Sequence, residues 1–174
     1  MFTATRQSGN FRAVLGKISI ALALFTVLVL GPAGMIDLNQ RLDWPHWQVP
    51  AGRMIGGGLM AGAVVVWLSC SRLFFRIGKG TPFINEPPKH LVIAGLYRYS
   101  RNPIYVAHVA FLFAWFLGSG CFTLLPYTGF IIVLLHAFIV WWEEPGLRKR
   151  FGEDYARYTQ SVPRWLFIQP RRRV

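Results

Sequence analysis

The chain has few charged residues and very few acidic ones. Charged residues make up 15% of its 174 residues, and Asp and Glu contribute only 7 against 19 Lys and Arg. Soluble domains have about a quarter of their residues charged, so this composition, with 53% apolar residues, indicates a membrane protein. The excess of cations does not indicate a nucleic-acid partner, because the cations lie at the ends of apolar segments and not along one face.

Cysteine and histidine are also scarce, and they are scattered. Cys70 and Cys121 lie near opposite ends of predicted membrane segments, so both are expected to be free thiols. The 4 histidines have no second ligand beside them in the sequence, and no metal site is predicted. No serine lies in a nucleophile elbow with histidine and acid partners, which argues against a serine hydrolase.

What the chain does contain is a set of long apolar segments. A helix needs about 20 residues to cross the hydrocarbon core, so we expect one all-α integral membrane domain, residues 1–174, with about four transmembrane helices. Gly31-Pro32 is expected to kink or end the first helix. The third should begin at Pro103 with Asn102 as its cap. The predicted spans are 14–35, 54–75, 103–118 and 121–142.

Polar segments on one side of this arrangement carry nearly all of the cations. They precede the first span, join the second span to the third, and follow the fourth, so both termini and the 76–103 loop are expected to be cytoplasmic at the inner membrane. In the last segment, apolar and aromatic residues recur every three or four positions, which predicts an amphipathic helix over 146–159.

The stretch 89–105 within the polar loop combines cations, hydroxyl-bearing rings and turn residues. Lys89, Gly95, Arg98 and Arg101 are part of it, and such donors suit a small-molecule anion site. A tight hairpin between the third and fourth spans would bring the end of this stretch back beside Glu143. We therefore expect a composite site at the membrane surface, made of two segments that are distant in sequence.

The same residues carry a family resemblance. The pattern G-x-Y-R-x-x-R-N-P-x-Y ends at Tyr105 and is followed by Glu143-Glu144-Pro145, by FGEDYARY and by VPRW. This order resembles the isoprenylcysteine carboxyl methyltransferase family and its bacterial relatives, which share motifs with phospholipid methyltransferases. The resemblance covers roughly Gly78 to Trp165 and implies an integral-membrane enzyme that uses S-adenosylmethionine.

The resemblance also implies which positions contact the cofactor. Two departures from the family pattern are visible: its eukaryotic members have histidine at the position of Asn102, and an arginine tied to substrate at the position of Ile139. The second departure does not favour a prenylcysteine carboxylate as the acceptor. With Gly95, Arg98 and Arg101 from the preceding argument, the predicted cofactor site also includes Lys89, His90, Leu91, Val92, Tyr97, Asn102, Pro103, Ile104, Tyr105 and Glu143.

Two side chains are candidates for a general base, should the acceptor need one. Glu144, like Glu143, follows an apolar run in which a carboxylate is costly without a partner. Its alternative role is to end the helix and pair with Arg98 or Arg101. His136 lies within the fourth span, and its alternative role is a neutral imidazole bonded to a neighbouring helix.

These observations predict a membrane methyltransferase that acts on a lipophilic or membrane-delivered acceptor, whose methylated group is a carboxylate, a thiol or an amine. One alternative keeps the cofactor and uses a phospholipid amine or a small thiol as acceptor. Another is a non-catalytic membrane subunit that binds anionic lipid headgroups through Arg98 and Arg101. Membrane lipids are expected partners in every case, and nucleic acid in none.

Overall fold

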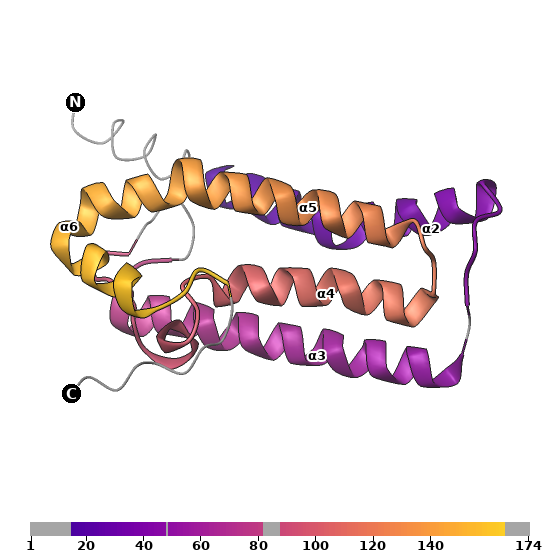
Figure 1. Ribbon diagram of the computed structural model, residues 1–174, viewed down its shortest axis with the longest axis horizontal. Coiled ribbons are helices and arrows are strands. Elements are labelled where there is room, and N and C mark those ends of the chain that lie inside the picture. Colours follow the sequence, from indigo (N-terminus) through magenta and orange to yellow (C-terminus); the bar gives the residue numbers. More distant parts are fainter. Residues whose placement is uncertain (1–14, 48, 82–87, 166–174) are drawn as a thin grey trace, which may run out of the picture.

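The computed structural model describes residues 15–47, 49–81 and 88–165, and its regular structure is helical (Figure 1). The nearest approach to a strand pairing in these residues is an isolated bridge between His46 and Cys121. Three of the described helices are long and apolar enough to cross a membrane. The all-α membrane fold expected from the sequence is confirmed.

The first helix runs from Leu15 to Arg41 and continues through the expected break. A π turn, η1 (Thr26–Leu30), precedes α2 (Gly31–Arg41), so Pro32 lies in the first turn after it. Pro32 has no N–H to donate to the preceding turn, and the helix continues because side chains bond carbonyls of that turn instead.

Aromatic side chains from neighbouring helices donate hydrogen bonds to carbonyl groups of the π turn η1. The Tyr127 hydroxyl donates to the carbonyl of Val27 at 2.7 Å, and Trp115 Nε1 donates to the carbonyl of Leu28 at 3.0 Å. A β-carbon at Gly31 would collide with the Tyr127 ring. Glycine at this position therefore allows the first helix to lie against the helix that contains Tyr127, α5 (Leu124–Phe138).

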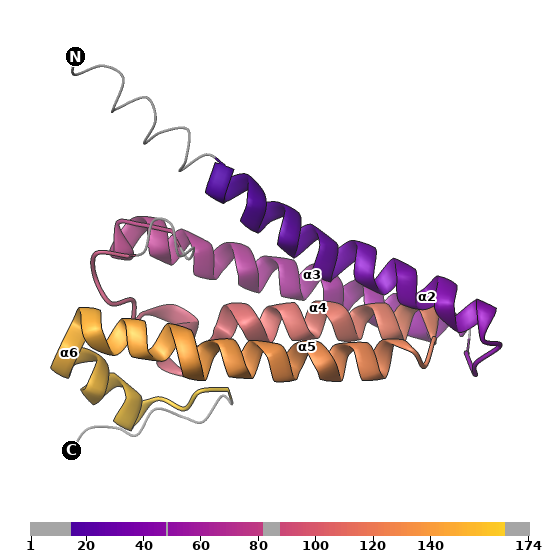
Figure 2. The ribbon, with the colours of Figure 1, turned by 90° about the horizontal axis from the view of Figure 1, so that it is seen from above.

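Two helices form the densest packing of the bundle, α3 (Pro50–Leu73), which continues as the π turn η2 (Phe74–Gly78), and α4 (Pro103–Ser119). A β-carbon on Gly56 would lie 2.8 Å from the Ala114 carbonyl oxygen, so glycine allows the close approach. α4 is shorter than the three continuous helices that are long enough to cross a membrane, and it lies between α3 and α5 (Figure 2).

A tight connection joins α4 to α5 (Leu124–Phe138). Gly120 has a φ of 69°, and a β-carbon there would overlap the Trp47 carbonyl oxygen. The Trp47 ring packs edge-on against Phe116, with centroids 4.9 Å apart. The hairpin expected between the third and fourth spans is therefore present.

The helix after this hairpin is longer than predicted. α5 passes through the π turn η4 (Ile139–Glu143) directly into α6 (Glu144–Ser161), whereas the sequence predicted a separate helix over 146–159. Gly152 breaks α6 with a φ of 52°, and the chain turns back there toward the start of α4 (Figure 1). The continuous helix places two consecutive acids where the membrane span ends.

Candidate functional site

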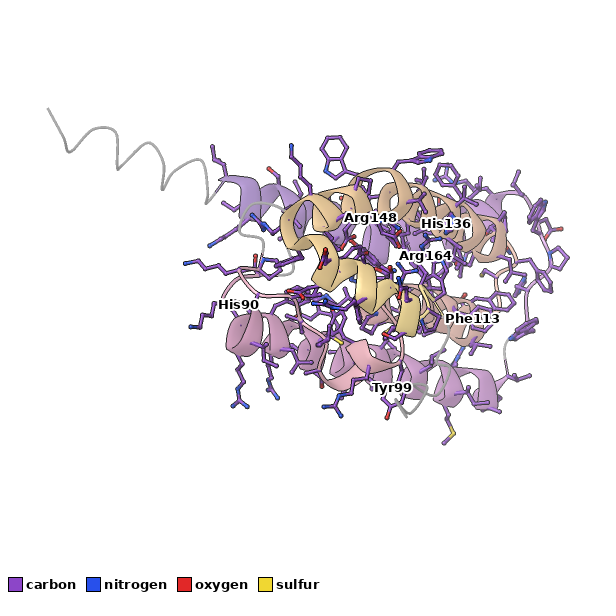
Figure 3. All side chains as sticks on the ribbon, turned by 60° about the vertical axis from the view of Figure 1, so that its left-hand side comes forward. His90, Tyr99, Phe113, His136, Arg148 and Arg164 are labelled. Carbon is purple, nitrogen blue, oxygen red and sulfur yellow. The ribbon has the colours of Figure 1, made fainter. Side chains whose placement is uncertain are left out.

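The candidate site lies at the end of the bundle where α6 folds back. Figure 3 brings this end forward and shows His90, Arg148 and Arg164 around it. The loop 88–102, which includes the short helix η3 (Gly95–Arg98), faces α6 here. Segments distant in sequence thus meet at one place, as the hairpin argument predicted.

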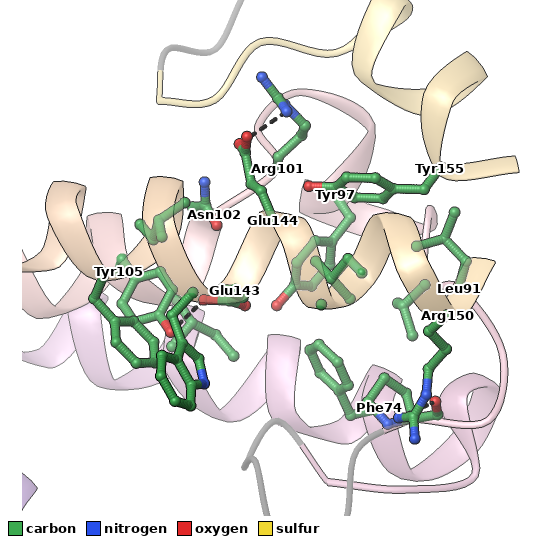
Figure 4. A pocket seen from close by; sticks show the side chains of 18 of the residues that line it. Phe74, Leu91, Tyr97, Arg101, Asn102, Tyr105, Glu143, Glu144, Arg150 and Tyr155 are labelled. Carbon is green, nitrogen blue, oxygen red and sulfur yellow. Dashed lines mark hydrogen bonds and ion pairs between the residues drawn. The ribbon is translucent and has the colours of Figure 1, made fainter. Parts of the chain in front are cut away.

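A cavity of about 680 Å³ occupies this meeting point (Figure 4). Its walls come from the first helix, α3, the 88–102 loop, α4, α5 and α6. Nine of the residues predicted from the sequence line it: Leu91, Val92, Tyr97, Arg101, Asn102, Ile104, Tyr105, Glu143 and Glu144.

Other predicted cofactor residues surround the cavity without lining it. The side chains of Lys89 and His90 are exposed, and their backbone N–H groups donate to the Gly78 carbonyl at 2.7 and 3.3 Å. Gly95 begins η3 with a φ of 59°, a conformation that favours glycine. Arg98 is exposed, and Pro103 is the buried first residue of α4.

The two consecutive glutamates point to different partners (Figure 4). Glu143 accepts a hydrogen bond of 2.7 Å from the Tyr105 hydroxyl. This bond joins the π turn η4 to the first turn of α4. It leaves Glu143 with further acceptor capacity that faces the cavity.

Glu144 is bonded by two arginines. Arg101 Nη1 donates to Oε1 at 2.9 Å, while Arg164 donates from Nε to Oε1 at 2.8 Å and from Nη2 to Oε2 at 3.0 Å. The hydrogen bond to Glu144 raises the pKa of the Arg164 guanidinium, so this pair stays charged. Glu144 is 6% exposed, and its expected pairing with Arg101 is observed, whereas Arg98 makes no such pair.

Arg164 was not among the predicted site residues, although VPRW had been noted as a motif. It belongs to residues 162–165, here called the C-terminal strap, which pass over the start of α4. The backbone N–H of Arg101 donates to the Pro163 carbonyl at 2.9 Å. Ser100 Oγ and Asn102 Nδ2 both donate to the Arg164 carbonyl, at 3.2 and 3.1 Å.

These bonds correct the expected role of Asn102. α4 does begin at Pro103, but the Asn102 side chain makes no capping bond to it and bonds the strap instead. The local pattern Asn-Pro predicts a cap because it contains no information about the strap, which comes from a distant part of the chain.

Tyrosines connect the strap end of α6 to the loop. The Tyr158 hydroxyl donates to the Tyr97 carbonyl at 2.7 Å, and the Tyr97 ring packs edge-on against Phe74 with centroids 5.5 Å apart. Burial raises the pKa of the Tyr97 hydroxyl, so this group stays neutral. Arg150 Nη1 donates to the Pro88 carbonyl at 3.3 Å and holds the outer end of the loop.

The two histidines of the apolar helices differ in position. His136 is exposed and outside the cavity lining, and its Nδ1 accepts a bond of 3.1 Å from Trp165 Nε1. The sequence left open a bond to a neighbouring helix, and the observed partner is instead Trp165 of the C-terminal end, beyond α6. His108 is 8% exposed and lines the cavity, and its Nε2 has no partner among the described residues.

A second cavity of about 330 Å³ lies within the apolar bundle between the first helix, α3 and α4. Leu24, Trp67 and His108 line both cavities, so the two adjoin each other. The remaining walls of the second cavity are apolar or aromatic side chains. Within residues 15–47, 49–81 and 88–165 no group of three or more His, Cys, Asp or Glu could hold a metal ion.

Comparison with known proteins places this arrangement in a family. The family model described as phospholipid methyltransferase matches residues 52–154, more than half of the chain. The chain belongs to the phospholipid methyltransferase family. The sequence resemblance is thereby confirmed for the phospholipid methyltransferases, and not specifically for the isoprenylcysteine enzymes.

Two relatives illustrate the similarity. The chain is 31% identical over 122 residues to a phosphatidylethanolamine N-methyltransferase of Aspergillus terreus, a match that covers 66% of this chain and 12% of that protein. It is 38% identical over 65 residues to an uncharacterized protein of Haemophilus influenzae, covering 36% of this chain and 100% of that one. The chain thus spans a small part of the fungal relative's length, and no solved structure matches.

Proposed function

We propose that this chain is an integral-membrane methyltransferase that uses S-adenosylmethionine. The observation that carries the proposal is the cavity of about 680 Å³ at the folded-back end of α6, which has acceptor groups on one side and cations on the other. Small-molecule sites are commonly roughly 300–1,000 Å³ in volume, so the size is appropriate. Membership of the phospholipid methyltransferase family supports the same chemistry.

The residues that line the cavity fit the chemical groups of the cofactor. Glu143 has free acceptor capacity for an amine or ribose hydroxyls, and Arg101 lies on the wall as a donor for a carboxylate. Leu91, Val92 and Ile104 contribute apolar wall for the adenine ring. We propose these five residues, with Tyr97 and Tyr105 as the hydroxyl-bearing neighbours, as the core of the cofactor site.

When bound there, S-adenosylmethionine would supply a methyl group already activated by a positive sulfonium. The chain's own residues then have to position the two reactants and exclude water, which is what a mostly apolar cavity wall does. A strong general base is not required when the acceptor is nucleophilic. Glu144 is a poor candidate for a base in any case, because two guanidiniums favour its ionised form.

For the acceptor, we propose a membrane lipid with an amine headgroup. The fungal relative is named for methylating phosphatidylethanolamine, which supports an amine over a carboxylate or thiol. The adjoining apolar cavity of about 330 Å³ is suited to a hydrocarbon chain that approaches from the bilayer. In this arrangement the headgroup reaches the first cavity past His108.

The proposed location is the inner membrane with the site on the cytoplasmic side. Most of the described cations lie at the site end of the bundle, and only Arg41 and Arg53 lie at the hairpin end. The positive-inside rule then favours a cytoplasmic site end. A cysteine introduced at Asp154 should react with a membrane-impermeant label that is applied from the cytoplasmic side. Reaction only from the opposite side would contradict this orientation.

Calorimetry with S-adenosylhomocysteine and purified protein tests the cofactor assignment. We expect saturable heat with the wild type, and weaker binding by about tenfold or more for Glu143→Ala and for Tyr97→Ala, because each substitution removes contact surface or a charged acceptor. Glu153→Ala is the matched control, since that side chain is exposed on α6. Absence of heat at high micromolar ligand would favour a lipid-binding subunit without catalysis.

Transfer of a labelled methyl group tests the acceptor. Vesicles that contain phosphatidylethanolamine should yield labelled lipid with the wild type, and vesicles of phosphatidylcholine alone should not. If label appears only on an added small thiol or on a carboxylate, the cofactor proposal holds and the lipid-amine acceptor is wrong.

A further inference from the structure

The cluster of Arg101, Glu144 and Arg164 has an uncompensated positive charge beside the cavity. Two guanidiniums share a single carboxylate, and the exposed fractions of the side chains are 12% for Arg101, 9% for Glu144 and 30% for Arg164. The other nearby acid, Glu143, bonds Tyr105 and points away from the cluster. A charge this buried is costly without a counter-ion, so the cluster is suited to an anionic ligand.

Arg101 also has an unused donor. Its Nη1 bonds Glu144, but its Nε is buried and has no partner among the described residues. Buried donors are paired in the great majority of cases, so an unpaired guanidinium nitrogen on a cavity wall indicates a missing acceptor. Lys149 and Arg150 line the same cavity and add positive charge. Among the described residues of its lining the acids are the two glutamates, so no further acid there competes for Arg101.

The C-terminal strap holds Arg101 in position beside Glu144. The Pro163 carbonyl accepts from the Arg101 backbone, and the Arg164 carbonyl accepts from the two residues that flank Arg101. At the same time the Arg164 guanidinium bonds both oxygens of Glu144. Glu144 is therefore shared, and it neutralises Arg101 only in part.

We infer that Arg101, positioned by Arg164 and the strap, forms an oxyanion subsite of the cavity. It binds either the carboxylate of the cofactor's amino acid moiety or the phosphate of the acceptor lipid. This inference rests on the proposed function, in which Arg101 is a donor for a carboxylate. It adds the lipid phosphate as the other oxyanion that Arg101 can bind, and it gives Arg164 a positioning role that acts through Glu144 and Arg101.

The test compares two ligands that differ in the carboxylate. S-adenosylhomocysteine has an amino acid moiety, and 5′-methylthioadenosine lacks it. If the cofactor's carboxylate occupies the subsite, Arg101→Gln weakens the first ligand about tenfold or more, since a charge-assisted bond is lost, and leaves the second unchanged. Arg164→Gln lowers the affinity ratio, which is the affinity for S-adenosylhomocysteine divided by the affinity for 5′-methylthioadenosine. Arg164→Lys restores part of this ratio because a charge remains beside Glu144.

Two controls separate this role from a general loss of folding. Arg157→Gln removes an exposed arginine that pairs with Asp154 on the outer face of α6, and it should leave the ratio unchanged. Arg101→Lys retains a positive charge near Glu144, so it should show a higher ratio than Arg101→Gln while both retain binding of 5′-methylthioadenosine. A purely structural role of Arg101 would weaken both ligands equally.

The second arm addresses the lipid phosphate. An unchanged ratio in Arg101→Gln, together with a KM for phospholipid raised about tenfold at unchanged kcat, would assign the subsite to the acceptor. If Arg101→Gln changes neither the affinity ratio nor the KM for phospholipid, the inference is overturned and the proposed function still stands. If the wild type binds neither nucleoside, the proposed function fails and this inference fails with it.

Discussion

At the scale of single residues, two identical neighbours have different environments. Glu143 has one neutral hydroxyl as its partner, whereas Glu144 has three hydrogen bonds from two guanidiniums. Successive positions on a helix point about 100° apart, so one carboxylate faces α4 and the other faces the strap. Acceptor capacity for a ligand therefore remains on Glu143, and the charge of Glu144 is used within the protein.

The Tyr105 hydroxyl orients the Glu143 carboxylate, which can be tested by removing it. We expect Tyr105→Phe to weaken S-adenosylhomocysteine binding about tenfold, because a bond to a carboxylate on the cavity wall is lost and the carboxylate becomes free to turn. Tyr99→Phe is the matched control, since Tyr99 is 38% exposed and lies outside the cavity. Equal affinities of both variants would show that the Tyr105 bond does not prepare the site.

His136 was a candidate base from the sequence, and its position predicts a different outcome. Since His136 is exposed, bonds Trp165 and lies outside the cavity, His136→Phe should leave kcat within about twofold of the wild type. Methyl transfer at saturating cofactor measures this. A loss of a hundredfold or more with normal cofactor affinity would restore His136 as the base.

At the scale of elements, the α4–α5 hairpin determines whether the site can form. It sets the offset between Tyr105 at the start of α4 and Glu143 at the end of η4, the turn that continues α5. Gly120 allows this hairpin because a side chain there would meet Trp47. The connection itself is short and irregular. Its geometry depends on one left-handed residue, so the site depends on a glycine at the opposite end of the bundle.

Two glycines of this connection form a matched pair. Gly120→Ala should lower the free energy of unfolding by more than about 1 kcal/mol, since it adds a positive-φ penalty to a backbone overlap. Gly118→Ala should have little effect, because a β-carbon there meets nothing within 4 Å. Thermal unfolding in detergent compares them, and equal melting temperatures would argue against the overlap.

The elements show how much a local pattern can predict. The four apolar segments, the start of α4 at Pro103 and the hairpin were all predicted, because each depends on neighbouring residues. The continuation of α5 into α6 was not, since the π turn η4 that joins them has no obvious sequence signal. The Arg164 contacts were also missed, because they join residues separated by 62 to 64 positions or by the fold of α6.

At the scale of the whole molecule, two cavities lie next to each other, one at the site end and one within the apolar bundle. The first has charged groups on its walls, and the second lies among apolar side chains of three helices. Large exposed apolar residues such as Phe25, Val133 and Trp141 cover the outside of the bundle, as expected for a surface in contact with lipid. A lipid acceptor can therefore approach without crossing water.

Filling the second cavity should separate acceptor binding from cofactor binding. Val64 lines this cavity and Val65 does not, although both are exposed side chains of α3. We expect Val64→Trp to lower kcat/KM for a phospholipid acceptor about tenfold, because the bulky ring occupies the space proposed for the lipid's hydrocarbon chain. The affinity for S-adenosylhomocysteine should stay the same. Val65→Trp should change neither, and equal effects of the two substitutions would remove the second cavity from the acceptor path.

The π turn at Ile139–Glu143 has a consequence for how this protein can vary in length. Such a turn contains one more residue than an ordinary helical turn, so deletion of Val140 would restore regular pitch and leave the direction of α6 nearly unchanged. Glu144 would then keep both arginines. A single-residue deletion should thus be tolerated at this turn, whereas a deletion within the regular part of α5 would rotate everything that follows by about 100°.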